Sequence, residues 1–162
     1  MRLGEGVEWG LHCATVLALV PAEMAMPAGR LAEFHGVPAA YLAKALQSMS
    51  RAGIVESVAG RHGGYRLARP ATEVTLLDIV LAIDGDDTAF RCSEIRRRGP
   101  SRVAARHYTP VCAIAGAMWH AEEAWRAELR ATSLADLLGQ LAHSVSPESA
   151  AKAVTWMQEV LS

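Results

Sequence analysis

Apolar residues in the first part of the chain recur with the 3.6-residue period of amphipathic helices. Three helices are predicted there, over residues 7–19, 28–35 and 38–52. The first is expected to bury a stripe formed by Leu11, Thr15, Ala18 and Leu19. The third turns Leu42, Leu46 and Met49 to one face, and Gly36 supplies a tight turn before it. Two helices joined by a short turn are typical of a helix-turn-helix.

A β-hairpin is expected directly after the third helix. Residues 54–58 and 65–67 are short strand candidates. Gly60, Gly63 and Gly64 lie between them and can take the positive φ of a hairpin loop. Helix, short helix, turn, helix and hairpin in this order predict a mainly α protein, a winged helix-turn-helix with a small β-hairpin wing.

The second half of the chain is predicted to be helical on either side of a polar loop. A fourth helix should begin at Thr75, where Thr75 and Asp78 have the spacing of a capping box, and end at Asp84. Three further helices are expected, over residues 111–131, 133–141 and from 147 onward. The chain then divides into a winged helix-turn-helix DNA-binding domain, a loop, and a C-terminal helical part, over residues 1–84, 85–110 and 111–162.

The predicted helix over residues 111–131 has more apolar surface than a small domain needs. Its stripe consists of Ile114, Met118, Ala121, Trp125 and Leu129. A long surplus stripe suits a two-fold interface between identical chains. We therefore expect a long dimerisation helix and a homodimer, although a helix that packs only within its own subunit is the alternative.

Composition indicates an ordinary soluble protein, with 51% hydrophobic and 20% charged residues in 162 and a net charge of −1. No apolar stretch reaches the roughly 18 residues of a membrane span. The apolar segment 13–20 follows Glu5 and Glu8 rather than the basic leader of a signal peptide. We expect a cytoplasmic protein without membrane contact, whose three cysteines are free thiols or metal ligands.

Basic charge is concentrated in the helix-turn-helix. Between residues 27 and 69, six basic residues face two acidic ones, a local charge of +4 that can attract phosphates. The outward face of the third helix is small at its start and polar or basic afterwards, which suits a helix that enters the major groove of double-stranded DNA. The predicted DNA contacts on this helix and at the wing tip are Ala39, Ala40, Tyr41, Lys44, Gln47, Ser48, Arg51, Arg61 and His62.

Four side chains form the well-matched set of metal ligands in the sequence. Glu8 and His12 are four residues apart and project from one face of the first helix. Cys92 and Cys112 lie in and at the end of the polar loop. Two thiolates, an imidazole and a carboxylate suit a metal cofactor, provided that the loop reaches the first helix.

Three segments, residues 36–44, 60–67 and 74–80, resemble the Rrf2 family of bacterial winged-helix regulators, which includes the iron–sulfur regulator IscR and the nitric-oxide-sensitive repressor NsrR. The similarity covers residues 1–131. It implies a homodimer crossed by long helices, palindromic promoter DNA as the ligand and, in many members, an iron–sulfur cluster as the sensor.

The loop departs from the usual family pattern of three closely spaced cysteines. Cys92 stands in the first position, Arg98 and Ala104 occupy the region of the others, and nineteen residues separate Cys92 from Cys112. Together with residues 7–13, this pattern looks most like the redox-responsive branch typified by RsrR. That resemblance implies a [2Fe-2S] cluster held by Cys92 and Cys112 of one subunit and by Glu8 and His12 of the other.

Several alternatives remain open at this stage. Trp9 lies next to Glu8 and is a switch candidate, although packing is the commoner role of a tryptophan. His107 competes with His12 as the histidine ligand. The two cysteines can instead form a disulfide under oxidation, or the four ligands can hold structural zinc. No nucleophile–base pair, phosphate loop or cofactor fingerprint favours an enzyme.

Overall fold

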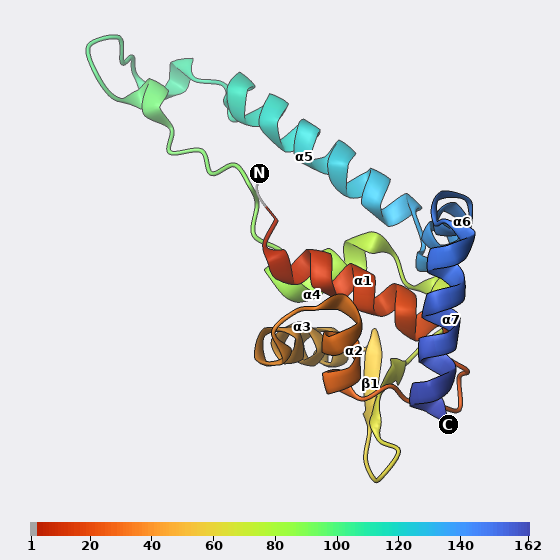
Figure 1. Cartoon of the computed structure of the whole chain (residues 1–162). Helices are drawn as coiled ribbons and strands as arrows, with labels where there is room; N and C mark the ends of the chain where they lie inside the picture. Colours follow the sequence, from red (N-terminus) through yellow and green to blue (C-terminus); the bar gives the residue numbers. More distant parts are fainter. Residues whose placement is uncertain (1–2) are drawn as a thin grey trace.

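The computed structural model describes residues 3–162, so the first two residues of the predicted DNA-binding domain lie outside it (Figure 1). The first half of the chain folds into the helices and strands of a winged helix-turn-helix. These elements are α1 (Glu5–Leu19), α2 (Ala28–His35), α3 (Ala39–Arg51), β1 (Val55–Val58), β2 (Gly64–Leu67) and α4 (Leu76–Asp84), with a 3₁₀ turn at Ala71–Glu73. The predicted fold class is therefore confirmed.

The core of this half lies where α1, α2 and α3 meet. Leu31 of α2 and the predicted inward residues Leu42, Leu46 and Met49 of α3 are fully buried. The predicted stripe on α1 is partly wrong, because Thr15 is buried but Leu19 is 58% exposed. α1 contacts α2, α3, α4, α6 and β2. A helix covered on several sides does not restrict its buried residues to a single stripe.

The wing is an antiparallel hairpin that is tied to the segment before α2. Val55 pairs with Leu67 and Val58 pairs with Gly64. Tyr65 and Met26 exchange two backbone hydrogen bonds, each of 2.9 Å. A Cβ atom on Gly64 would lie 2.2 Å from the carbonyl oxygen of Met26, so the close approach of the two backbones requires glycine at this position.

Short polar motifs set the helix starts in the second half. Thr75 and Asp78 form the predicted capping box of α4. Ser133 and Asp136 form an equivalent box at the start of α6 (Leu134–Ser144), and the Ser146 side chain accepts a hydrogen bond at the start of α7 (Pro147–Leu161). Each motif satisfies backbone N–H groups that have no partner inside the helix.

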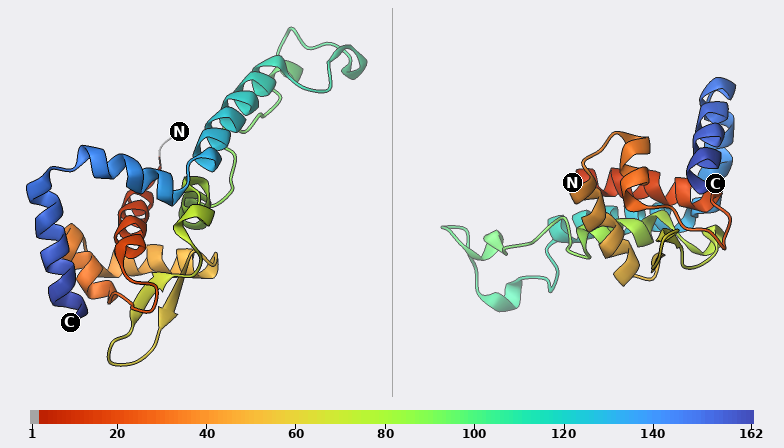
Figure 2. Two further views of the ribbon diagram at one scale, coloured as in Figure 1. Left: turned by 90° about the vertical axis from the view of Figure 1, so that its right-hand side faces the viewer. Right: turned by 60° about the horizontal axis from the view of Figure 1, so that its bottom comes forward.

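Between α4 and α5 (Ala113–Ala131) the chain extends away from the body (Figures 1 and 2). The first part of this loop is tied to the side of α5: Asp86 pairs with Arg126, and the Trp119 Nε1 group donates to the carbonyl oxygen of Phe90 at 3.3 Å. Farther out are two 3₁₀ turns that the sequence did not predict, Ile95–Arg97 and Ala105–His107.

Much of the apolar surface of α5 is uncovered within one chain. Ala115 is its one buried residue, whereas Ile114 is 68% and Met118 45% exposed. After α5, the helices α6 and α7 return to the body, where Leu134 is fully buried and the Trp156 ring lies 4.8 Å from that of Phe34. None of the helices within residues 3–162 combines the length and the hydropathy that a membrane-spanning segment needs.

Candidate DNA interface and metal centre

The outward face of α3 carries the predicted DNA contacts. Because Leu42, Leu46 and Met49 are fixed inward, the opposite face is open to solvent. Tyr41 is 61% exposed. The other side chains on this face are Ala39, Ala40, Lys44, Gln47 and Arg51, all exposed, and Ser48, which is half-buried. This arrangement places small residues first and longer polar or basic ones after them, the order that suits entry into a groove.

The ion pairs of the basic segment involve residues other than the predicted DNA contacts. Three arginines of the basic segment pair with acids: Arg30 with Glu33 at 2.7 Å, Arg66 with Glu56 at 2.7 Å, and Arg69 with Asp78 at 3.0 Å. Among residues 3–162, the remaining basic side chains of that segment, Lys44, Arg51 and Arg61, form no ion pair. Cations without an acidic partner are free to contact phosphates.

The wing tip presents two of the predicted contacts. Arg61 and His62 are both exposed in the turn between β1 and β2. Gly60 in this turn has φ 110°, a conformation that favours glycine, and Gly63 closes the turn with a backbone hydrogen bond of 3.0 Å to Gly60. The turn thereby holds a cation beyond the end of the two strands, on a different element from α3.

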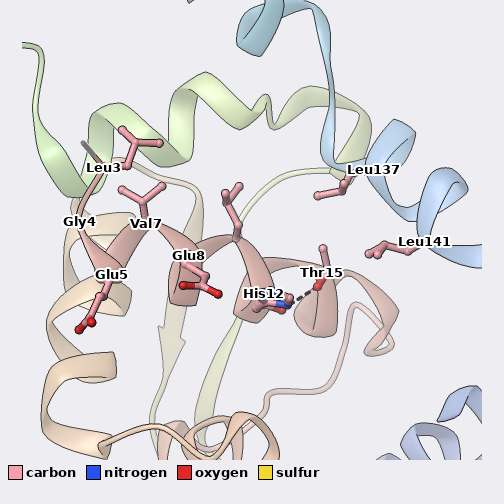
Figure 3. Close-up of a pocket in the computed structure, with 10 residues that line it drawn as sticks. Leu3, Gly4, Glu5, Val7, Glu8, His12, Thr15, Leu137 and Leu141 are labelled. Atoms are coloured by element: carbon pink, nitrogen blue, oxygen red, sulfur yellow. Dashed lines mark hydrogen bonds between the residues drawn. The ribbon is translucent and has the colours of Figure 1, made fainter. Parts of the chain in front are cut away.

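On the body of the protein, Glu8 and His12 share one exposed side of α1 (Figure 3). They border a groove of about 470 Å³ between α1 and α6. Its lining is mostly apolar and consists of Leu3, Gly4, Glu5, Val7, Glu8, Leu11, His12, Thr15, Leu137 and Leu141. The two predicted ligands are therefore accessible to a group that approaches from outside the chain.

The two predicted cysteine ligands lie on either side of the outer part of the loop, before and after its two 3₁₀ turns. Both are free and half-buried, and Cys112 is the N-cap residue of α5. Hydrogen bonds from the backbone N–H groups of Ala115 and Ile114, and then the nearby charge of Arg96, lower the pKa of the Cys112 thiol. In contrast, burial raises the pKa of Cys13 to about 12, which agrees with a packing role for this third cysteine.

The four predicted ligands form two separate pairs in a single chain. No group of three or more His, Cys, Asp or Glu side chains within residues 3–162 is placed to hold a metal ion. The loop that carries Cys92 and Cys112 points away from α1, as Figures 1 and 2 show. His107 lies exposed in the turn Ala105–His107 of the same loop. The assignment of all four ligands to one centre stays a prediction that requires a second chain.

Two aromatic contacts connect α1 to α2 and α3. The Trp9 ring meets that of Tyr41 on α3 edge to face, with centroids 6.3 Å apart, and Lys44 Nζ lies 5.5 Å from the centre of the Tyr41 ring. His12 lies 5.6 Å from His35, the last residue of α2. Burial, and then the charge of His12, lower the pKa of His35. Residues 8–12 of α1 therefore lie in direct contact with both α2 and α3.

Sequence reasoning missed three residues of this region. His35 carries no sequence signal because one histidine before a glycine turn has many roles. Glu94 and Arg96, which lie between the two cysteines, form an ion pair of 2.8 Å. Glu94 has φ 52°, the single positive φ of a non-glycine residue within residues 3–162. The abundance of arginine in this loop concealed the difference between Arg96 and its neighbours.

The comparison with known families agrees with the fold. A family model described as Rrf2, an iron-dependent transcriptional regulator, matches residues 3–140. The chain belongs to the Rrf2 family. It is accordingly a winged-helix DNA-binding protein of a family of transcription regulators, as its sequence motifs predicted, whereas its place in the RsrR branch stays a prediction.

Solved structures of similar fold include other regulators. CymR, the global cysteine regulator of B. subtilis, has a TM-score of 0.69 at 21% identity over 86% of this chain and 98% of that one. IscR of T. potens has a TM-score of 0.67 at 19% identity over 90% and 92%. An oxidised form of CymR from Staphylococcus aureus has a TM-score of 0.63 at 23% identity over 85% and 96%.

A sequence relative adds a shorter match. Protein aau3 of Rhizobium meliloti (strain 1021) is 45% identical to this chain over 64 residues. The match covers 40% of this chain and 42% of that protein, less than half of either. This short match adds little to the assignment. The family is shown by the family model, which matches residues 3–140, and the solved structures support the fold.

Proposed function

We propose that the protein is a homodimeric, redox-sensing transcription regulator of promoter DNA, without catalytic activity, that holds a [2Fe-2S] cluster between its subunits. Glu8 and His12 of one chain and Cys92 and Cys112 of the other would be the ligands. The observation that carries this proposal is the division of the four ligand-type side chains between two places, the exposed side of α1 and the loop, neither of which forms a complete site within residues 3–162. A two-fold axis would bring each pair to its complement and create two equivalent sites.

Two surfaces support the second chain. The exposed apolar side chains of α5, among them Ile114 and Met118, would be covered by a long helix of another copy. The groove beside Glu8 and His12 is bordered by Leu137 and Leu141, so it can accept an apolar segment next to the polar ligand pair. Val111 and Ile95, which are 50% and 72% exposed near the cysteines, have the required character.

The donor set fits an iron–sulfur group. Cys112 has a lowered pKa at the start of α5, which favours the thiolate that binds iron. Histidine is an accepted replacement for cysteine on one iron and raises the reduction potential, whereas a carboxylate is a harder and less usual ligand. When bound, the cluster supplies reversible one-electron chemistry. Glu8 and His12 would then register a change of charge directly on α1.

The contacts of α1 offer a route from this charge to DNA. Trp9, the switch candidate, follows Glu8 and touches Tyr41, which in turn lies beside Lys44 on the face predicted to contact DNA. His12 touches His35 at the end of α2. A small displacement of α1 would therefore shift the equilibrium between arrangements of the two recognition helices that bind DNA well or weakly.

A heterodimer experiment tests the shared site. One chain carries Glu8→Ala and His12→Ala, the other Cys92→Ser and Cys112→Ser, and each has a different affinity tag. Neither homodimer should bind a cluster. The mixed dimer purified through both tags without oxygen should hold one complete site, and so about half the iron, sulfide and visible absorption of the wild type. A colourless mixed dimer beside a coloured wild type would refute sharing between subunits.

Elemental analysis of the wild type separates the alternatives. Iron and sulfide in equal amounts, with reversible bleaching on reduction, support the cluster. Stoichiometric zinc without sulfide would indicate a structural metal site. A two-proton mass loss that joins Cys92 to Cys112, with no metal present, would indicate a thiol–disulfide switch. An iron-free protein that binds its operator at full strength would defeat the cluster proposal.

A further inference from the structure

The segments around the two cysteines are connected by a hydrogen-bond network that no sequence motif indicated. Cys92 and Cys112 are separated by nineteen residues of loop, and the outer part of that loop projects from the body. A flexible segment of this length brings its ends together only at an effective concentration in the millimolar range. Something must hold the two segments side by side if both thiols are to bind one centre.

Arg96 stands apart from the other arginines of the loop. Its side chain is 23% exposed, whereas that of Arg97 is 49% and that of Arg91 is 75% exposed. Its guanidinium donates to both carboxylate oxygens of Glu94, at 2.8 and 3.3 Å. It also donates to Thr109 twice, to the hydroxyl at 3.1 Å and to the carbonyl oxygen at 2.8 Å. One planar cation thus joins the two arms of the loop.

One end of this network reaches Cys92, and the other ends one residue before Cys112. The Cys92 Sγ atom lies 3.8 Å from a carboxylate oxygen of Glu94. The Thr109 hydroxyl donates to the carbonyl oxygen of Val111 at 2.9 Å, one residue before Cys112. The Tyr108 hydroxyl donates to the Arg96 carbonyl oxygen at 2.8 Å, and its ring lies 5.3 Å from the guanidinium. The side chain and the backbone of Arg96 are therefore both restrained.

Glu94 supplies an independent indication that this geometry is imposed. Its left-handed backbone, at φ 52°, is unfavourable for a residue with a side chain and persists where the surroundings enforce it. Its carboxylate is shared by Arg96 and Arg97, at 2.8 and 3.2 Å. The ion pairs hold Glu94 in this conformation and turn its carboxylate toward Cys92.

We propose that Arg96, acting through Glu94 and Thr109, is a positioning residue that holds the segments of Cys92 and Cys112 together before any metal or cluster is bound. The proposal rests on the proposed function only in assigning a purpose to the two thiols. Arg96 binds neither iron nor DNA in this role. The planar fork of arginine, with donors in two directions, is what the role requires, so lysine cannot replace it.

The test uses full-length, reduced, metal-free protein treated with diamide. Each disulfide formed removes two protons and two electrons from the thiols and reduces the diazene to the hydrazine. Mass mapping follows the bond between Cys92 and Cys112 in chains of monomer mass on a non-reducing gel. The alkylation rate of each thiol corrects for changes in thiolate content. Circular dichroism confirms that each variant keeps its helices.

Arg96→Met and Arg96→Lys should each slow pairing about tenfold, toward the rate of an unrestrained loop. Arg102→Met is the matched control, since Arg102 is an exposed arginine of the same loop whose side chain makes no hydrogen bond or ion pair within the described residues. It should pair like the wild type. Wild-type rates in Arg96→Lys would show that charge alone acts and would overturn the proposal, as would equal slowing in Arg102→Met.

The two proposals fail separately. If the Arg96 variants form the disulfide slowly but the wild-type protein never binds iron, the positioning role stands and the cluster proposal fails. A mixed dimer that holds iron and sulfide, together with wild-type pairing rates in all arginine variants, would keep the cluster and refute the role of Arg96.

Discussion

The attachment of the wing depends on the absence of one methyl group. In Gly64→Ala the new Cβ atom would lie 2.2 Å from the carbonyl oxygen of Met26, 2.3 Å from its carbonyl carbon and 2.6 Å from the nitrogen of Pro27. All three are backbone atoms, so no side chain can rotate away to relieve the overlap. The wing strand must move away from the segment before α2.

The cost follows from the bonds that this movement breaks. Tyr65 and Met26 exchange two hydrogen bonds of 2.9 Å, each worth about 0.5–1.5 kcal/mol net. Keeping the bonds and the overlap instead costs a similar amount, about 1–3 kcal/mol for overpacking. By either route we expect a loss of about 2 kcal/mol, which lowers the melting temperature of a chain of this size by about 4–8 °C. Arg61 and His62 would move with the strand, so operator affinity should fall as well.

Thermal unfolding followed by circular dichroism measures the effect, and a gel-shift titration measures binding. Gly29→Ala adds the same methyl group in α2, where a Cβ atom would meet nothing within 4 Å. It should leave the melting temperature unchanged or slightly higher, since alanine favours a helix. If Gly64→Ala melts within about 1 °C of the wild type, the contact with Met26 is not rigid and the reasoning is wrong.

Three further outcomes concern DNA and the thiols. Lys44→Ala should weaken operator binding by about 1–3 kcal/mol per contact, whereas Lys152→Ala on α7, paired with Glu148, should not; equal losses would contradict a specific contact. Arg61→Ala should reduce the slope of log affinity against log salt by about 2 in a dimer with two wing tips, and an unchanged slope would exclude a phosphate contact. In the metal-free protein the lowered pKa of Cys112 favours its thiolate, so iodoacetamide at neutral pH should label Cys112 before the buried Cys13, whose pKa burial raises to about 12. Equal labelling by mass spectrometry would contradict this order.

The order and type of the main elements could be predicted from local patterns. The predicted second helix and α2 share the bounds 28–35, and Thr75 with Asp78 starts α4 as expected. Such features depend on interactions within one or two helical turns, so the sequence itself contains them. The stripe of α1 was predicted less well, because burial there depends on which other helices cover it.

The residues of the candidate sites likewise divide into those that a local pattern predicts and those that only the three-dimensional fold brings together. The exposed face of α3 follows from the period of Leu42, Leu46 and Met49, and its prediction needed no tertiary information. The pairing of Glu94 with Arg96, by contrast, depends on the fold of a long loop, in which neighbouring arginines look alike in sequence. The contact of His12 with His35 arises where two helices cross, and no local pattern encodes such a meeting.

The exposed apolar flank of α5 would make the behaviour of such a regulator depend on its abundance in the cell. If the sensor is completed only when two chains meet, the number of working sensors depends on how many copies are present as well as on the chemical signal. At low abundance, pairs accumulate with the square of chain number, so halving synthesis removes more than half of the responsive molecules. Gene dosage would then set the level of oxidation at which transcription from a controlled promoter changes.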